Sequence, residues 1–403
     1  MPACSSSPSV VLDAVRAVEL SSRPLGVVES ITLLQALSAV PDPRRPRGRR
    51  HGLQSILFLA VGAVLAGARS YAAIAQWASH ADAPVVVCRS SPHAATFARV
   101  LAAVEVTVLQ QALTGWVLAR RAAAHPSEGA RGDVGRPAAE DRTVLAFDGK
   151  NLRGARTGTG GQAKLAAVFD HAHGLVLAQA EVVGGDELAA FIPALEILPD
   201  LRGVVVTADA LHCQRAHADY LHGRGAHYLF TVKANQPALR RALARLPWAQ
   251  APGLIERQQG HGRAESRSIK VIDLDGTPEA GLFPHGARAI KVIRRRRRTG
   301  TAHRSMETVY ALTSLDHRDA DSGLLACWIR SHWTIENRLH WVRDVTQGED
   351  HSTIRTGNGP QVIAALRNTA INLIRLRGGT NIAAAHRDFS YQPADVLDAL
   401  TAA

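Results

Sequence analysis

Two aspartates each follow a short apolar run that predicts a β-strand. Asp148 follows the run 143–147, and Asp209 follows the run 204–208. Sites in α/β folds form at the carboxyl ends of strands, so both residues are well placed to do chemistry. Two carboxylates at one rim repel each other unless a divalent cation lies between them. If the two strands are neighbours, the pair predicts a metal site, although each aspartate alone could simply begin a turn.

A third carboxylate, Glu336, lies in a segment that we predict to be one long helix, 323–345. At 3.6 residues per turn, His332, Glu336, His340 and Arg343 fall on one polar stripe. A separate apolar stripe, which we expect to face the sheet, comprises Leu325, Trp328, Ile335, Leu339 and Val342. A solvated amphipathic face would show the same pattern, so that alternative stays open.

The types of these candidate ligands indicate which metal they would hold. Carboxylate oxygens without cysteine favour Mg²⁺ or Mn²⁺ over zinc. Two such ions can activate an attacking hydroxyl and stabilise a leaving oxygen in an in-line displacement at phosphorus. His332 and His340 flank Glu336 and raise a zinc alternative, but the spacing is not HExxH. The sequence has no GxxxxGK[ST] motif and no GxGxxG between a strand and a helix, so ATP or NAD chemistry is not expected.

The charge of the chain predicts a polyanionic partner. The 403 residues carry a formal net charge of +12, for which nucleic acid is the first candidate and an anionic membrane the second. Most of the positive charge is arginine, and the chain is rich in Ala and Gly. This composition suggests a GC-rich bacterial genome, which raises arginine content without selection for binding. Charge alone therefore does not decide for DNA.

Cysteine usage and hydropathy predict a soluble, cytoplasmic protein. Cys4, Cys88, Cys213 and Cys327 form no CxxC pair, so neither a disulfide framework nor a zinc site is expected. The N-terminus has no signal-peptide pattern. The longest apolar run, 56–68, is shorter than the ~20 residues that span a bilayer, and it predicts a buried helix.

The order of the predicted elements indicates several regions. A loosely ordered leader (1–28) precedes a mostly helical N-terminal domain (30–122) with helices at 31–37, 53–68, 71–78 and 95–122. A polar linker (123–142) leads to an α/β region (143–377), and a tail (378–403) follows. Predicted strands are 143–147, 164–169, 175–183, 204–208 and 228–232; predicted helices are 187–198, 213–222, 237–246 and 360–375. This order predicts a mixed sheet with helices on both faces, and alternating segments predict a β-rich insertion at about 250–315.

Four motifs in this order resemble the bacterial insertion-sequence transposases with an Asp-Asp-Glu triad, in particular the H-repeat-associated group. They are FDGKNLRGAR around Asp148, VTADALHCQ around Asp209, YLFTVKANQ around Lys233 and RSHWTIENRLHWVRDVTQGED around Glu336. HGRAESR (261–267) and the N-terminal PDPRRPRGRR also match, and the resemblance runs from about 33 to 377. It implies an RNase H-like catalytic domain in which Asp148, Asp209 and Glu336 bind two Mg²⁺ or Mn²⁺ ions.

The resemblance also implies contacts with double-stranded DNA, both the terminal inverted repeats and the target. Because transposition joins two DNA ends, a homodimer on the DNA is a further expectation, although nothing in the sequence identifies its interface. The residues expected to contact DNA are Lys150, Lys233, Asn235, Gln236, Arg263, Arg295, Arg296, Arg297, Arg338, His340 and Arg343. The chain departs from the group's Tyr-Arg-Glu-Lys signature, because Ile329, His332 and Arg343 stand at its Tyr, Arg and Lys positions. How the DNA end is held is therefore open.

Two basic runs, 44–50 and 294–298, contain adjacent arginines. Their side chains repel one another, and a bound polyanion would reduce this repulsion. A solvated hairpin tip is the alternative for the second run.

We expect an enzyme that cleaves insertion-sequence ends and joins the 3′-OH to target DNA, acting on the nucleoid. The alternatives are an inactive DNA-binding relative that acts as a repressor, and a nuclease that cannot join strands. The presence of all three acids favours the enzyme.

Overall fold

The computed structural model describes residues 32–47, 49–80, 90–124, 142–156, 162–260, 263–298 and 304–402. The predicted leader 1–28 and most of the predicted linker 123–142 lie outside these residues. The chain divides into two compact units. The first comprises Met1–Asp133, Gly149–Asp200 and Ile335–Ala403, and the second comprises Val134–Asp148 and Leu201–Thr334.

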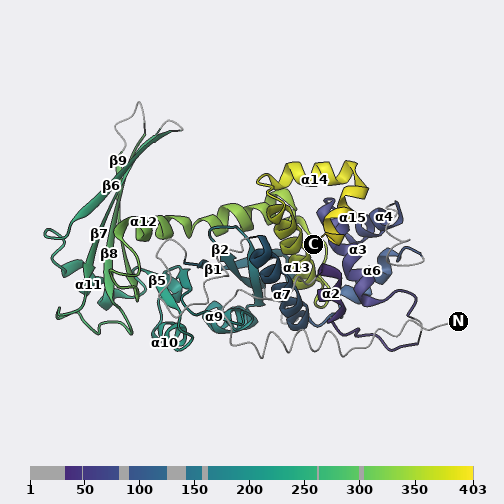
Figure 1. The fold of residues 1–403 in the computed structure, drawn as a ribbon, viewed down its shortest axis with the longest axis horizontal. Helices are drawn as coiled ribbons and strands as arrows, with labels where there is room; N and C mark the ends of the chain where they lie inside the picture. Colours follow the sequence, from purple (N-terminus) through teal and green to yellow (C-terminus); the bar gives the residue numbers. More distant parts are fainter. Residues whose placement is uncertain are drawn as a thin grey trace. The chain divides into compact units, whose positions relative to one another are not determined.

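Helices form the N-terminal part of the first unit, as predicted. They are α2 (Leu33–Ser38), α3 (Leu53–Leu65), α4 (Tyr71–His80), α6 (Ala94–Leu101) and α7 (Val106–Ala124). Helix α3 is buried along nearly its whole length because it is apolar on all sides, as in the centre of a bundle. It packs against α13 (Gly359–Leu376), which also contacts α7 (Figure 1). Two helices far apart in the sequence thus share one core.

The prediction of a single helix at 95–122 is wrong. The segment is broken into α6 and α7 by a turn that has its own hydrogen bonds. The Glu105 carboxylate accepts a hydrogen bond from the backbone N–H of Thr107 at 3.0 Å, as an N-terminal cap does. The side-chain amide of Asn358 donates to the carbonyl of Val104 at 2.8 Å. Both groups satisfy backbone atoms that the break would leave unpaired.

The segment that we predicted as a tail forms two packed helices, α14 (Ile382–Tyr391) and α15 (Pro393–Thr401). Helix α15 packs on α2 and α3 (Figure 1) and buries Leu400. On α14, the buried His386 bonds through Nδ1 to the carbonyl of Leu65, at the end of α3, at 2.7 Å. These helices close the core around α3.

A β-hairpin completes the first unit. Strands β2 (Gln162–Asp170) and β3 (Val176–Glu181) pair antiparallel, and α9 (Glu187–Glu196) packs against both. At the turn, the buried Asp170 carboxylate accepts hydrogen bonds from two backbone N–H groups and pairs with Arg121 of α7 at 2.8 Å. The predicted hairpin is therefore present, and an ion pair anchors it to the helices.

The second unit contains parallel strands followed by the predicted β-rich insertion. The first residues of β1 (Val144–Arg156) pair parallel with β4 (Val205–Ala208), which pairs parallel with β5 (His227–Val232). The insertion consists of β6 (Gly253–Gly260), β7 (Arg263–Asp273), β8 (Arg288–Arg298) and β9 (Arg304–Thr313), all antiparallel, and β9 returns to pair with β5. Helices α10 (Arg215–Gly223) and α11 (Pro237–Arg245) connect the strands.

The described strands form one mixed sheet in the order β3-β2-β1-β4-β5-β9-β8-β7-β6. This order confirms the expected RNase H-like mixed sheet with a β-rich insertion. Strand β1 is longer than predicted and continues to Arg156, so Asp148 is not its last residue. Its parallel pairing with β4, however, ends at Phe147. Asp148 therefore lies at the end of the paired segment, as the site hypothesis requires.

The predicted helix 323–345 is interrupted. Helix α12 (Ser322–Ser331) packs its apolar side, including Leu325 and Trp328, on the insertion (Figure 1). Two π-helical segments follow at Glu336–His340 and Val342–Thr346. Their hydrogen bonds run from residue i to i+5, so the four-residue spacing that we used to place one polar stripe does not hold here. Such π-turns frequently occur at functional sites.

No single described helix is long and apolar enough to cross a bilayer; only the sharply bent pair α6 and α7 meets the length and composition criteria jointly.

Candidate metal and DNA site

The strand register places the two predicted aspartates at matching positions. In the parallel pair β1 and β4, Phe147 is the partner of Ala208, and the next residue on each strand is Asp148 or Asp209. Neighbouring strands lie about 4.8 Å apart, so the two carboxyl-bearing residues lie side by side where the pairing of β1 with β4 ends. Both are half-buried. The sequence predicted a metal site on the condition that the two strands are neighbours. This condition is met within the second unit.

The carboxylate of Asp209 begins a short 3₁₀ turn, Ala210–His212. Its Oδ1 accepts the backbone N–H of Leu211 at 2.9 Å. Behind this turn, His212 is fully buried and packs edge-on against Phe147, with ring centroids 4.6 Å apart. The turn is therefore held against β1, which limits how far Asp209 can move from Asp148.

Residues after β5 brace the same turn. The side-chain amide of Asn235 donates to the carbonyl of Ala210 at 2.6 Å, and that of Gln236 donates to the carbonyl of Cys213 at 3.0 Å. Lys233 is exposed. We expected all three to face DNA. The structure gives the two amides a supporting role, and their contact with DNA stays a prediction.

Thr207 and His332 form a contact that the sequence did not predict. The Thr207 hydroxyl on β4 lies 2.9 Å from Nδ1 of His332, at the end of α12. The same hydroxyl lies 3.2 Å from the carbonyl of Leu145 on β1. The end of α12 is thereby fixed to the strand that carries Asp209. The only signal in the sequence was a polar residue in the otherwise apolar run of β4.

In the first unit, Glu336 is paired with His340. Oε2 of Glu336 lies 3.4 Å from Nδ1 of His340; the Glu336 side chain is about half exposed, and His340 is buried. Burial lowers the pKa of His340 below its usual value, against the opposing effect of Glu336. The imidazole is therefore held neutral beside the carboxylate, where it can orient Glu336 or offer its own nitrogen to a metal.

Arg343 differs from the expectation of a DNA phosphate contact. Its side chain is completely buried, and its guanidinium donates to both carboxylate oxygens of Glu349, at 3.0 and 2.9 Å. Lys150 is also buried and pairs with Asp344 at 2.5 Å. Both cations compensate neighbouring carboxylates, which explains why they lie inside the protein. Arg338 is half-buried, and its carbonyl accepts a hydrogen bond from Arg375.

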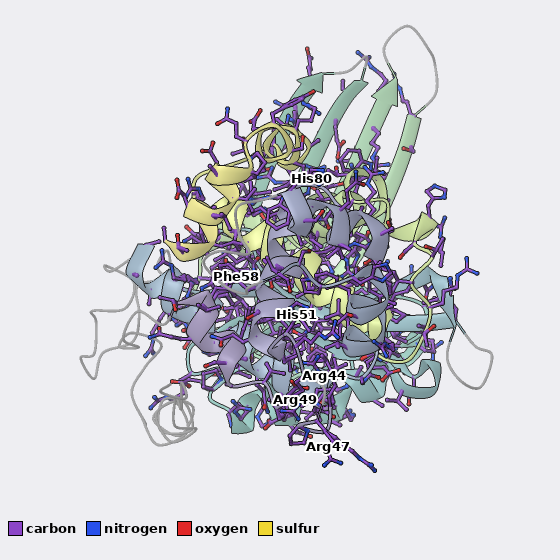
Figure 2. All side chains as sticks on the ribbon, turned by 90° about the vertical axis from the view of Figure 1, so that its right-hand side faces the viewer. Arg44, Arg47, Arg49, His51, Phe58 and His80 are labelled. Atoms are coloured by element: carbon purple, nitrogen blue, oxygen red, sulfur yellow. The ribbon has the colours of Figure 1, made fainter. Side chains whose placement is uncertain are left out.

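The two basic runs lie in different settings. Residues 294–298 form the last part of β8, so the run lies in a strand, and solvation of its exposed members stays the alternative to DNA contact. In the N-terminal run, Arg44 makes two hydrogen bonds to Asp42, at 2.9 and 2.7 Å, and donates to the carbonyl of His51. Arg47 is exposed and projects outward (Figure 2). Arg263 is the first residue of β7, and its side chain lies outside the described part of the chain.

Two family models match the chain. Residues 34–117 match the DDE_Tnp_1-associated model, and residues 139–373 match the Transposase DDE domain. The second match alone covers more than half of the sequence, so the chain belongs to the DDE transposase family. Transposases of this family depend on divalent metal ions, which fits the two aspartates that directly follow the paired segment of β1 and β4.

Several Escherichia coli proteins, among them H-repeat-associated putative transposases, are similar to this chain over most of its length. The "Putative transposase YncI" of Escherichia coli O157:H7 is 29% identical over 370 residues, covering 86% of this chain and 89% of that protein. The "H repeat-associated putative transposase YhhI" of E. coli K12 is 27% identical over 355 residues, covering 85% and 90%. Among solved structures, the piggyBac transposase synaptic complex with hairpin DNA covers 97% of this chain and 80% of its own, with 11% identity and a TM-score of 0.38.

Proposed function

We propose that the protein cleaves insertion-sequence ends and joins the freed 3′-OH to target DNA, with Asp148, Asp209 and Glu336 holding two Mg²⁺ or Mn²⁺ ions. The observation that carries this proposal is the register of β1 and β4, which sets two half-buried aspartates side by side. Without a cation between them, two neighbouring carboxylates would repel each other. The donor set consists of hard oxygens, which fits these metals.

The chain path supports Glu336 as the third ligand. His332 is bonded to Thr207, two residues before Asp209. Glu336 follows His332 by four residues in the sequence. The neutral His340 beside Glu336 would orient its carboxylate, as partners of metal ligands commonly do. Glu336 is also the third acid of the Asp-Asp-Glu order in the sequence, within the residues that match the Transposase DDE domain.

When bound, the two ions would supply Lewis-acid stabilisation of the attacking and leaving oxygens at phosphorus. The residues of the chain would position the three carboxylates and hold the DNA. Asn235 and Gln236 would do so indirectly, by fixing the turn after Asp209, and the exposed Lys233 would contact a phosphate. Double-stranded DNA is the proposed partner, in the bacterial cytoplasm, and a homodimer on DNA stays a prediction.

A strand-transfer assay tests this function. The purified protein is mixed with DNA carrying the element's ends and with a target plasmid, in Mg²⁺, in Mn²⁺ and in EDTA. We expect joined product in either metal and none in EDTA. Cleavage without joining would identify a nuclease instead. Binding without cleavage in either metal would identify an inactive DNA-binding relative.

A further inference from the structure

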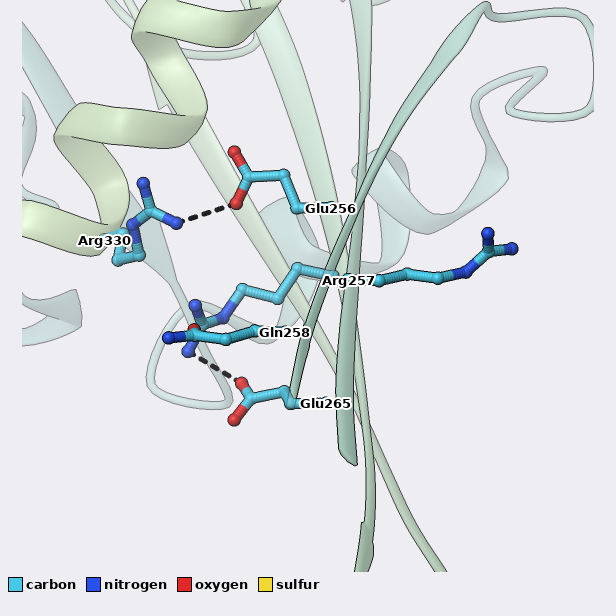
Figure 3. Close-up of a pocket in the computed structure, with 6 residues that line it drawn as sticks. Glu256, Arg257, Gln258, Glu265 and Arg330 are labelled. Atoms are coloured by element: carbon cyan, nitrogen blue, oxygen red, sulfur yellow. Dashed lines mark hydrogen bonds and ion pairs between the residues drawn. The ribbon is translucent and has the colours of Figure 1, made fainter. Parts of the chain in front are cut away.

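The β-rich insertion presents two faces of opposite electrostatic character. Side chains alternate between the faces of a strand, and the register of β6 to β9 has no shift. One face, the helix face, lies toward α12, because Arg330 of α12 pairs with Glu256 of β6 at 2.8 Å. The other, the far face, carries the alternate residues. Figure 3 shows Glu256 and Glu265 directed toward α12 and Arg257 directed the opposite way.

The helix face is balanced in charge. Glu265 lies at its centre, beside Arg294 and Arg267, the latter 2.7 Å away, and Arg296 is within 3.9 Å. The hydrogen bond from Arg294 holds the pKa of Glu265 below its usual value. The arginines on this face are therefore occupied by a carboxylate of the same sheet.

The described residues of the far face include cations and no acid. Across the described strand residues, the far-face positions of β6 to β9 include Arg257, Lys270, Lys291, Arg295, Arg297 and Arg304, and none of these positions is Asp or Glu. The four arginines are exposed, and none makes an ion pair within the described part of the chain. Exposed apolar residues, Ile255 and Met306, lie on the same face.

Two of these arginines form an unfavourable pair. Arg297 of β8 lies directly opposite Arg304 of β9 in the register, and like charges in that position destabilise a sheet. On the β6 side, the residue opposite Arg295 is the small Ser266 of β7. Arg295 and Arg297 are separated by about 7 Å along the strand. The result is an array of exposed guanidinium groups that have no ion pair among the described residues, and such groups are well suited to phosphate oxygens.

We propose that the far face binds the sugar-phosphate backbone of duplex DNA through Arg257, Arg295, Arg297 and Arg304. Arg294 and Arg296, in the same run of the sequence, stabilise the sheet through Glu265 and do not contact the duplex. The proposal rests on the proposed function in taking DNA as the partner. Successive arginines of the run point to opposite faces of β8, so they have two different roles. The phosphate contacts are independent of DNA sequence.

Two double variants that remove equal charge test this division. Arg295→Ala/Arg297→Ala changes the far face, and Arg294→Ala/Arg296→Ala changes the helix face. Binding to a random-sequence duplex is measured by fluorescence anisotropy over a series of KCl concentrations, in EDTA so that no cleavage occurs. Each lost phosphate contact reduces the slope of log K against log [salt] by about 0.9. We expect the magnitude of the slope to be smaller by about 2 in the far-face variant than in the wild-type protein. The helix-face variant should keep the wild-type slope.

Equal slopes in the two double variants would overturn the proposal, since net charge alone would then explain binding. A larger loss in the helix-face variant would also overturn it. Arg295→Lys/Arg297→Lys should retain most of the slope, and thermal melting confirms that each variant is folded. A parallel series with phosphatidylcholine–phosphatidylserine vesicles tests the membrane alternative: vesicle binding that depends on Arg295 and Arg297 while DNA binding does not would replace DNA as the partner.

The outcomes separate this inference from the catalytic proposal. If the two double variants show the slope difference but the wild-type protein forms no joined product in Mg²⁺ or Mn²⁺, the catalytic proposal fails and the DNA-binding face stands. If Arg295→Ala/Arg297→Ala forms joined product with the wild-type salt slope, the face fails and catalysis stands.

Discussion

The guanidinium of Arg343 forms two hydrogen bonds with the carboxylate of Glu349, and both side chains are buried. Arg343 lies in the second π-helical segment, which follows the segment that carries Glu336. Arg367 of α13 donates to the same carboxylate at 2.9 Å. The buried carboxylate therefore joins the π-helical region to the central helix of the first unit, so a proposed metal ligand depends on an ion-pair network for its position.

Removing Glu349 should destabilise the protein strongly. Glu349→Ala leaves Arg343 and Arg367 buried without a counter-charge, and breaking a buried pair in this way costs about 3–5 kcal/mol. Urea unfolding monitored by circular dichroism measures the loss. The matched control is Glu256→Ala, which breaks the partly exposed pair with Arg330 and should cost about 1 kcal/mol or less. Equal effects of the two changes would show that the buried network does not carry stability.

Each proposed metal ligand should be needed for cleavage but not for DNA binding. Asp148→Asn, Asp209→Asn and Glu336→Gln keep the side-chain shape and remove the charge that holds a cation. We expect each to reduce cleavage by more than about 100-fold, since even the partners of metal ligands commonly contribute 10–100-fold. Gel assays of end cleavage and of DNA binding measure the two properties. Asp275→Asn, at an exposed turn position, is the control and should cleave normally; near-normal cleavage by any of the three ligand variants would remove that residue from the site.

The sequence was sufficient to predict the paired aspartates, for a physical reason. An apolar run that ends in a charge marks both a buried strand and its rim, and the register of β1 and β4 then follows from burying both runs. The extension of β1 to Arg156 was missed because its residues after Asp148 are polar and glycine-containing. Whether such a segment is a strand depends on a neighbouring strand, which local sequence does not show.

The position of Arg343 could not be predicted because it depends on two non-local features. The π-helical hydrogen bonds rotate it away from the stripe that a regular helix would give. The chain then turns at Gly348, whose φ is +63°, and this turn brings Glu349 back toward the guanidinium. An arginine on a polar stripe is usually solvated, and only the tertiary arrangement reveals that this one is a buried partner.

Two helix glycines should respond oppositely to alanine. A Cβ at Gly62 of α3 would lie 2.7 Å from Cη2 of Trp77, so the indole ring would have to move. Overpacking of this kind costs about 1–3 kcal/mol. At Gly115 of α7 no heavy atom lies within 4 Å of the added Cβ, and Gly→Ala there should stabilise the helix by up to about 1 kcal/mol. Thermal melting of Gly62→Ala and Gly115→Ala compares them; stabilisation of both would show that α3 and α4 have room to separate.

The buried His386 should make stability depend on pH. Burial lowers its pKa below the usual 6.5, against the hydrogen bond to the Leu65 carbonyl, and nearby Arg69 lowers it further. The unfolded chain therefore binds a proton near pH 6.5 that the folded protein does not. The contribution of the neutral His386 to the free energy of unfolding is complete above that pH. It decreases as the pH falls toward the folded-state pKa, by at most about 1.4 kcal/mol per pH unit for one proton.

Replacing the imidazole isolates this contribution. Urea unfolding of the wild-type protein and of His386→Gln at a series of pH values from neutral to mildly acidic gives the two slopes. The variant should be less stable at neutral pH, because the contact between α14 and the end of α3 is altered, but its stability should decline less steeply below pH 6.5. If the stability of the two proteins changes equally with pH, protonation of His386 is not linked to unfolding, and the prediction is wrong.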